Sequence, residues 1–153
     1  MARYRRYIRK SFKKRNAERV IRGGTSSVSA NTQQIAYTYT ATEACTVKSI
    51  KLDIGSSNAT EDNYSKVQAY VLALVPEGYN ANPITYPALT EDMYNPTNFV
   101  LISGILTDAV VEDHKYNMIG RKMKKGDRLA LIIANKADGS HTISFEISFS
   151  VLT

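Results

Sequence analysis

Cationic side chains are concentrated at the start of the chain, in MARYRRYIRKSFKKRNAERVIR (residues 1–22). This segment holds seven arginines and three lysines against one carboxylate, Glu18, so its formal charge is +9. Because the whole chain is +6, residues 23–153 sum to −3. Guanidinium groups donate paired hydrogen bonds that match phosphate oxygens, and blocks of like charge commonly act as interaction tails. The segment therefore predicts binding to a polyanion.

Aromatic side chains are interleaved with these cations. Tyr4, Tyr7 and Phe12 can stack on unpaired bases while neighbouring arginines contact phosphates. This combination predicts a nucleic acid as the partner, bound with little sequence preference because phosphate contacts position without specifying. The residues predicted to bind it are Arg3, Tyr4, Arg5, Arg6, Tyr7, Arg9, Lys10, Phe12, Lys13, Lys14, Arg15, Arg19 and Arg22.

Three other interpretations explain this segment less well. A mitochondrial transit peptide would be rich in serine, but Ser11 is the only serine in residues 1–24. A membrane-surface helix needs a broader apolar face than one isoleucine, one phenylalanine and two tyrosines supply. A solvated charge run of no consequence is disfavoured because blocks of like charge are usually interaction tails. No run of 18 or more apolar residues occurs, so we also expect no insertion into a membrane.

A helix is predicted over residues 4–20, because Tyr4, Ile8 and Phe12 follow helical spacing and form one stripe. Like charges four residues apart oppose such a helix in isolation. We therefore expect the stripe to pack against the body or other subunits, with a polyanion neutralising the charges. Gly23-Gly24 is interpreted as the end of the helix and a flexible hinge.

The basic segment forms an arm, residues 1–24, and the rest of the chain, residues 25–153, forms a body that must position it. The body has the pattern of an all-β protein. Segments with alternating or continuous apolar residues follow one another at short intervals, with turn residues between them. About eight antiparallel strands in such a length suit a single jelly-roll sandwich. The predicted strands are 33–41, 47–55, 66–75, 99–106, 109–118, 128–135 and 141–153.

Three local features refine this prediction. A slip in the alternation near Ser49 indicates a β-bulge. Asp138-Gly139 predicts a hairpin that joins strand 128–135 to strand 141–153. Residues 76–98, which contain all four prolines, are expected to form an ordered surface loop.

The sequence offers no constellation of catalytic residues, so an enzyme, a cofactor and a metal site are not expected. Glu112-Asp113-His114 carries ligand types, but adjacent residues of a strand point to opposite faces. His141 is expected to be solvated beside its turn, and Cys45 to be a small buried thiol. Two acidic pairs at 61–62 and 91–92 leave a calcium ion at a subunit contact as a minor alternative.

A second basic cluster lies at residues 121–125, where Arg121, Lys122, Lys124 and Lys125 surround a methionine. The following Gly126-Asp127 indicates a turn. The favoured interpretation is a solvated turn, and the alternative is a second surface that faces phosphates.

The arginine- and tyrosine-rich opening MARYRRYIRKSFKKR resembles the arms of capsid proteins of circular, Rep-encoding single-stranded DNA (CRESS-DNA) viruses. The compact body that ends in RLALIIAN and HTISFEISFSVL is also similar to coat proteins of satellite RNA viruses. The resemblance implies an icosahedral T=1 shell of about 60 copies, with each arm directed inward onto the packaged genome. It also implies a virion location and, with the basic cluster at 13–15, passage through the host nucleus.

The arginine- and tyrosine-rich composition of the arm favours single-stranded DNA over RNA as the cargo. A function of another class also remains open, namely a non-viral nucleic-acid-binding β-module of ribosomal or nucleoid-associated type. A ligand-binding jelly roll, in which the basic tail is incidental, is a third alternative.

Overall fold

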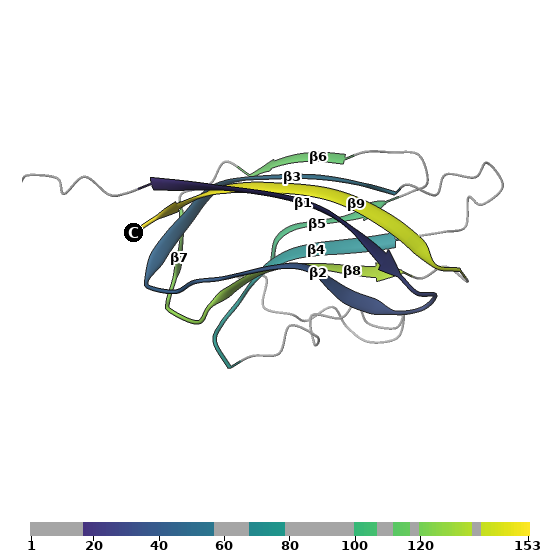
Figure 1. Cartoon of the computed structure of the whole chain (residues 1–153), viewed down its shortest axis with the longest axis horizontal. Coiled ribbons are helices and arrows are strands. Elements are labelled where there is room, and N and C mark those ends of the chain that lie inside the picture. The colour runs from purple at the N-terminus through teal and green to yellow at the C-terminus, as the bar shows by residue number, and fades with distance from the viewer. Residues whose placement is uncertain (1–16, 57–67, 79–99, 107–111, 117–119, 136–138) are drawn as a thin grey trace, which may run out of the picture.

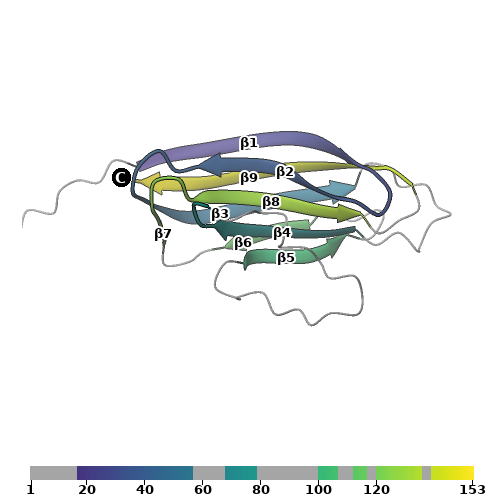
Figure 2. The same cartoon turned by 90° about the horizontal axis from the view of Figure 1, so that it is seen from below.

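The computed structural model describes residues 17–56, 68–78, 100–106, 112–116, 120–135 and 139–153, with the backbone alone for 112–116. Two antiparallel β-sheets lie face to face in this part of the chain, and it contains no helix. Figure 1 shows the two layers edge-on, and Figure 2 shows the long strands running nearly parallel to one axis. The all-β prediction is confirmed.

Sheet A has the strand order β1-β9-β3-β6, with the short β7 also paired to β3, and sheet B has the order β2-β8-β4-β5. First and last strands are therefore neighbours, and the chain crosses repeatedly between the two sheets, as in a jelly roll, with β4–β5 and β6–β7 as the consecutive strands that stay in one sheet. Sheet A contains β1 (Ala17–Val28), β3 (Cys45–Ser56), β6 (Glu112–Tyr116), β7 (Arg121–Met123) and β9 (His141–Leu152). Sheet B contains β2 (Gln33–Thr40), β4 (Gln68–Val75), β5 (Val100–Leu106) and β8 (Arg128–Asn135).

The core lies between the sheets and follows from the period-2 pattern of their strands. On β9, the alternate residues from Ile143 to Val151 are buried, while Ser144 and Glu146 on the opposite face are exposed. Two tyrosines of β2 close the side of the core by packing on β9. Tyr37 lies 6.3 Å from Phe145, and Tyr39 lies 5.2 Å from Phe149 in an edge-to-face arrangement, measured between ring centroids.

The predicted β8–β9 hairpin is wrong, because the two strands belong to different sheets. β8 pairs with β2 and β4, whereas β9 pairs with β1 and β3. The burial of the two strands gives the reason. β8 is buried on both of its faces and takes an interior position in sheet B. β9 has a polar face of serines and a glutamate, on which Ser144 and Glu146 are exposed to solvent.

The helix predicted over residues 4–20 is wrong for residues 17–20, which belong to β1, and residues 4–16 lie outside the described part. The interpretation of Gly23-Gly24 as a hinge is also wrong, because both residues pair with β9. Gly24 lies opposite Phe145, and a Cβ atom there would be 3.1 Å from the tip of the Phe145 ring. The glycine leaves room for an aromatic ring of the core.

Other predictions at the level of elements are confirmed. All seven predicted strands are present, and the register between β3 and β9 shifts between Lys48 and Lys51. Ser49 has a positive φ of 53°, as a bulged residue can adopt. Of the predicted surface loop, only residues 76–78 are described.

A buried amide holds the end of the sandwich where β1, β8 and the β8–β9 connection meet. The Asn135 side chain donates from Nδ2 to the carbonyls of Val28 (3.0 Å), Ser29 (3.2 Å) and Gly139 (2.7 Å). His141 lies in this region opposite Val28, and it is 2% exposed. The expectation of a solvated His141 is therefore wrong, because the residue is the first of β9 and pairs with Val28 instead of lying in the turn.

Candidate nucleic-acid interface

The structure describes two of the predicted nucleic-acid-binding residues, Arg19 and Arg22, and the other eleven lie in residues 1–16. Both arginines are on β1 and both are exposed. Residues directly opposite in an antiparallel pair project from the same face of the sheet. Arg19 is opposite Ser150, on the outer face of sheet A, whereas Arg22 is opposite the core residue Ile147. The structure therefore places the two arginines on different faces of β1.

Arg22 occupies an inward register position at the open edge of the sandwich, and its side chain remains exposed there. Its Nη1 donates to the carbonyl oxygen of Ile21 over 3.1 Å. Burial raises the pKa of Tyr37 on the facing sheet, and the positive charge of Arg22 partly opposes that rise. Arg22 therefore borders the aromatic side of the core, away from the outer face of sheet A.

Arg19 belongs to a group of cations on the outer face of sheet A, which we call the basic patch: Arg19 on β1, Lys48 and Lys51 on β3, and Lys122 on β7. The register of the strands places these four residues on the same face of the sheet. Arg19, Ser150 and Lys48 form one row across β1, β9 and β3. Lys51 stands one row further along, opposite Ser148. Lys122 is opposite Thr46, in the row where β1 begins.

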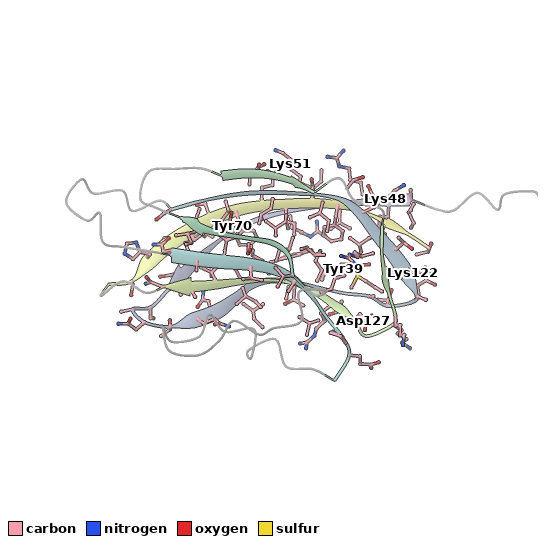
Figure 3. All side chains as sticks on the ribbon, turned by 180° about the vertical axis from the view of Figure 1, so that it is seen from behind. Tyr39, Lys48, Lys51, Tyr70, Lys122 and Asp127 are labelled. Atoms are coloured by element: carbon pink, nitrogen blue, oxygen red, sulfur yellow. The ribbon has the colours of Figure 1, made fainter. Side chains whose placement is uncertain are left out.

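Figure 3 shows Lys48 and Lys51 above the β3 ribbon and Lys122 near the end of the sandwich that holds β7. Neighbouring strands lie about 4.8 Å apart, so the α-carbons of Arg19 and Lys48 are separated by about 10 Å. Two residues along a strand span about 7 Å, and Ser150 and Ser148, the partners of Lys48 and Lys51, are two residues apart, so about 7 Å is the separation expected between the two lysines. Four cations from three strands thus share one small surface.

The charges on this face are distributed unevenly. Lys51 forms an ion pair with Asp53, with 2.6 Å between Nζ and Oδ2. Within the described part of the chain, Arg19, Lys48 and Lys122 have no carboxylate partner. The next row holds Glu146 opposite Asp53, so the carboxylates lie further from the start of β1. The face is therefore cationic beside the point where residues 1–16 join the sandwich.

Lys48 and Lys51 are not among the residues predicted from the sequence. Lys122 belongs to the cluster at 121–125, for which a solvated turn is the favoured interpretation of the sequence and a phosphate-facing surface the alternative. The cluster at 121–125 divides in the structure. Lys122 is on the outer face, Arg121 is opposite the core residue Val47, and Lys124 and Lys125 are exposed at the β7–β8 turn. No short-range motif links Lys48 to Lys122. Only the pairing of β3 with β7 brings them together.

The described residues contain no group of three or more histidine, cysteine, aspartate or glutamate side chains placed to hold a metal ion. Cys45 is buried, as predicted, and burial raises the pKa of its thiol. Tyr39 donates a hydrogen bond to this thiol, which opposes that rise. The same part of the chain has no helix that is long and apolar enough to cross a membrane.

No protein-family model matches the chain, and no curated protein matches its sequence. Solved structures with a similar arrangement of strands include the VP2 subviral particle of infectious bursal disease virus (10% identity, TM-score 0.47) and the decameric BFDV capsid protein (7% identity, TM-score 0.49). A third belongs to a family of Bacillus endospore appendage pili (9% identity, TM-score 0.44). The alignments cover 91%, 91% and 90% of this chain, and 33%, 99% and 90% of the respective structures. The chain thus spans about one third of the length of VP2, and each similarity is weak and concerns the fold alone.

Proposed function

We propose that this chain is a viral capsid protein that assembles into a small icosahedral shell and packages a single-stranded nucleic acid through its cationic N-terminal arm. Single-stranded DNA is the favoured cargo, and the assembly is a homo-oligomer of about 60 copies. The arm acts through residues 1–16, with Arg19 and Arg22 contributed by β1.

One observation carries this proposal: the most cationic segment of the chain directly precedes an edge strand of a jelly-roll sandwich. Residues 1–16 contain eight arginine and lysine side chains and no carboxylate. They join the sandwich at Ala17, which pairs with Leu152 in the last strand. Because β1 is paired with β9 over its whole length, the cationic segment is anchored at a fixed place on the body.

The separation of charge suits an assembly that closes around a polyanion. The body after residue 22 sums to −3, so copies of it repel one another only weakly. The arms repel one another strongly until phosphates surround them. About 60 arms of +9 carry about 540 positive charges, which neutralise a large part of a genome of order 10³ nucleotides. Assembly and packaging are then coupled through electrostatics.

The test is to purify the protein, examine it by electron microscopy and digest the extracted contents with DNase and with RNase. We expect uniform closed particles whose nucleic acid is removed by DNase. A matched variant should delete residues 2–16 and keep all of β1, because a longer deletion would remove a strand that pairs with β9. We expect this variant to retain the fold and lose the nucleic acid.

The outcomes separate the proposal from its alternatives. A monomer that binds nucleic acid and never forms particles would support a non-viral binding module. A monomer or trimer that holds no nucleic acid, and is unaffected by the deletion, would support a ligand-binding jelly roll. Particles with contents sensitive to RNase alone would retain the capsid function and overturn the preference for DNA.

A further inference from the structure

We propose that the basic patch on the outer face of sheet A is a second phosphate-binding surface, which holds the same polynucleotide that the arm binds. This inference rests on the proposed function and adds which side of the sandwich faces the cargo. It assigns contacts to Lys48, Lys51 and Lys122, and it joins Arg19 to them rather than to the arm alone.

The first argument is the position of the patch relative to the arm. Ala17 begins β1 in the row formed with Leu152 and Thr46, and Lys122 lies opposite Thr46 in that row. The next row contains Arg19 and Lys48. Residues 1–16 therefore join the sandwich at the margin of the patch. A strand of nucleic acid bound near that junction meets the patch without any rearrangement of the sheet.

The second argument is the chemistry of the surface. Ser150 lies between Arg19 and Lys48 in their row, and Thr46 lies beside Lys122. Hydroxyl groups donate hydrogen bonds to phosphate oxygens, as lysine and arginine do. The four residues of the patch carry no aromatic ring on which a base could stack. The surface therefore suits the backbone of a nucleic acid and carries no preference for a base.

The third argument is the contrast with the outer face of sheet B. That face is formed by small and apolar residues that pack into a second buried cluster, including Val71, Ala73 and Ile132. Ile35 and Ile105, at the two edges of sheet B, are exposed by 38% and 51%. Of the two broad faces, the outer face of sheet A is the one with a group of exposed cations in the described residues. A polyanion is attracted to sheet A.

The ion pair of Lys51 does not remove it from the patch. The side chains of Lys51 and Asp53 are 37% and 27% exposed, so their attraction is screened by solvent. An exposed ion pair of this kind contributes about 0–1 kcal/mol. A phosphate can therefore compete with Asp53 for the ammonium group. Lys48 and Lys122 have no such competitor among the described residues, which makes them the better positions for a test.

The experiment measures binding of the full-length protein to oligothymidylate over a series of salt concentrations. The test variant is Lys48→Gln with Lys122→Gln, and the matched control is Lys124→Gln with Lys125→Gln. Both pairs remove two positive charges from exposed positions, but the control residues lie at the β7–β8 turn. Each phosphate contact contributes about 0.7 to the slope of log Kobs against log salt for a single strand. We expect the test variant to lower the magnitude of that slope by about 1.4 and the control to leave it unchanged.

A further variant, Lys48→Arg with Lys122→Arg, retains the charges and should keep the wild-type slope. An unchanged slope in the glutamine test variant, or an equal reduction in the control, would overturn the inference. A test variant that fails to assemble while binding oligothymidylate with the wild-type slope would also overturn it, because the patch would then contact a neighbouring subunit. If the wild-type protein itself binds no oligothymidylate, the proposed function fails, which is a distinct result.

Discussion

Asn135 shows how one polar side chain can position several segments of the chain. Its side chain is fully buried and donates to three carbonyl groups: that of Val28 at the end of β1, that of Ser29 in the turn that follows, and that of Gly139 in the β8–β9 connection. Buried carbonyl groups that lose their donor keep their desolvation cost. This side chain therefore contributes to the fold through partners that are more than a hundred residues away in sequence.

Replacing Asn135 with alanine should destabilise the sandwich by about 2–3 kcal/mol, because the carbonyls of Val28 and Gly139 would be left without this donor. The measurement is the free energy of unfolding in urea. Ser140→Ala, at an exposed position nearby, is the control and should change it by less than about 0.5 kcal/mol. Equal stability of the Asn135 variant and the wild type would contradict this account.

Cys45 is the single cysteine of the chain, which makes its reactivity simple to measure. Burial raises the pKa of its thiol, and the thiolate is the reactive form. We expect the native protein to react with a disulfide reagent near neutral pH at least about tenfold more slowly than the unfolded protein. Similar rates in the two states would show that the thiol is accessible in solution.

At the scale of elements, Gly104 on the edge strand β5 illustrates a competition between propensity and packing. Alanine is favoured over glycine inside a strand by about 0.5–1 kcal/mol. However, a Cβ atom at Gly104 would clash with the hydroxyl oxygen and the ring of Tyr70, which is fully buried on the neighbouring β4. Overpacking of this kind costs about 1–3 kcal/mol. We therefore expect packing, and not propensity, to decide whether alanine at position 104 stabilises or destabilises the protein.

We predict that Gly104→Ala lowers the free energy of unfolding by up to about 2.5 kcal/mol, the overpacking cost less the gain in propensity. Gly139→Ala is the matched control, because a Cβ atom there would meet nothing within 4 Å. Thermal unfolding of both variants beside the wild type provides the comparison. A Gly104 variant that is more stable than the wild type would show that Tyr70 moves aside at little cost.

Strands with a clear apolar alternation could be predicted from the sequence, and their partners could not. The alternation in HTISFEISFSVL identifies the buried face of β9, but it holds no information about which strand lies beside it. β1 escaped prediction because arginines and two glycines replace the apolar residues of an ordinary strand. β7 has three residues, too few to show a period.

The candidate site also has one part that could be predicted from the sequence and one that could not. The cationic arm is visible in the sequence because its residues are consecutive. The basic patch is not, because Lys48 and Lys122 are brought together by the pairing of β3 with β7, and Arg19 by the pairing of β1 with β9. A bulge at Ser49 also shifts Lys51 onto the same face as Lys48. Register is a long-range property, and local patterns do not encode it.

At the scale of the whole molecule, three groups give the stability a defined dependence on pH. Burial raises the pKa values of Tyr37, Tyr39 and Cys45 above their ordinary values of 10.0, 10.0 and 9.0. On raising the pH, the unfolded chain releases these protons first, so the folded state then binds more protons than the unfolded state. Stability therefore falls as the pH rises through this range.

We expect the free energy of unfolding to be constant through neutral pH with respect to these groups, and to fall above about pH 9. Urea unfolding at a series of alkaline pH values tests this. Tyr39→Phe should reduce the decline, since phenylalanine does not titrate and the contribution of the raised Tyr39 pKa is removed. If the free energy of unfolding falls equally in the variant and the wild type above about pH 9, groups other than Tyr39 cause the fall.

The pairing of Ala17 with Leu152 has a practical consequence for anything attached to this protein. A peptide or enzyme fused after Thr153 would leave the sandwich within one or two strand spacings of the cationic segment, as the position of the C-terminus in Figure 1 indicates. If the protein forms the proposed shell with its arms directed inward, the fused payload would be enclosed together with the nucleic acid and shielded from external proteases. A display epitope should instead be inserted away from this end of the sandwich.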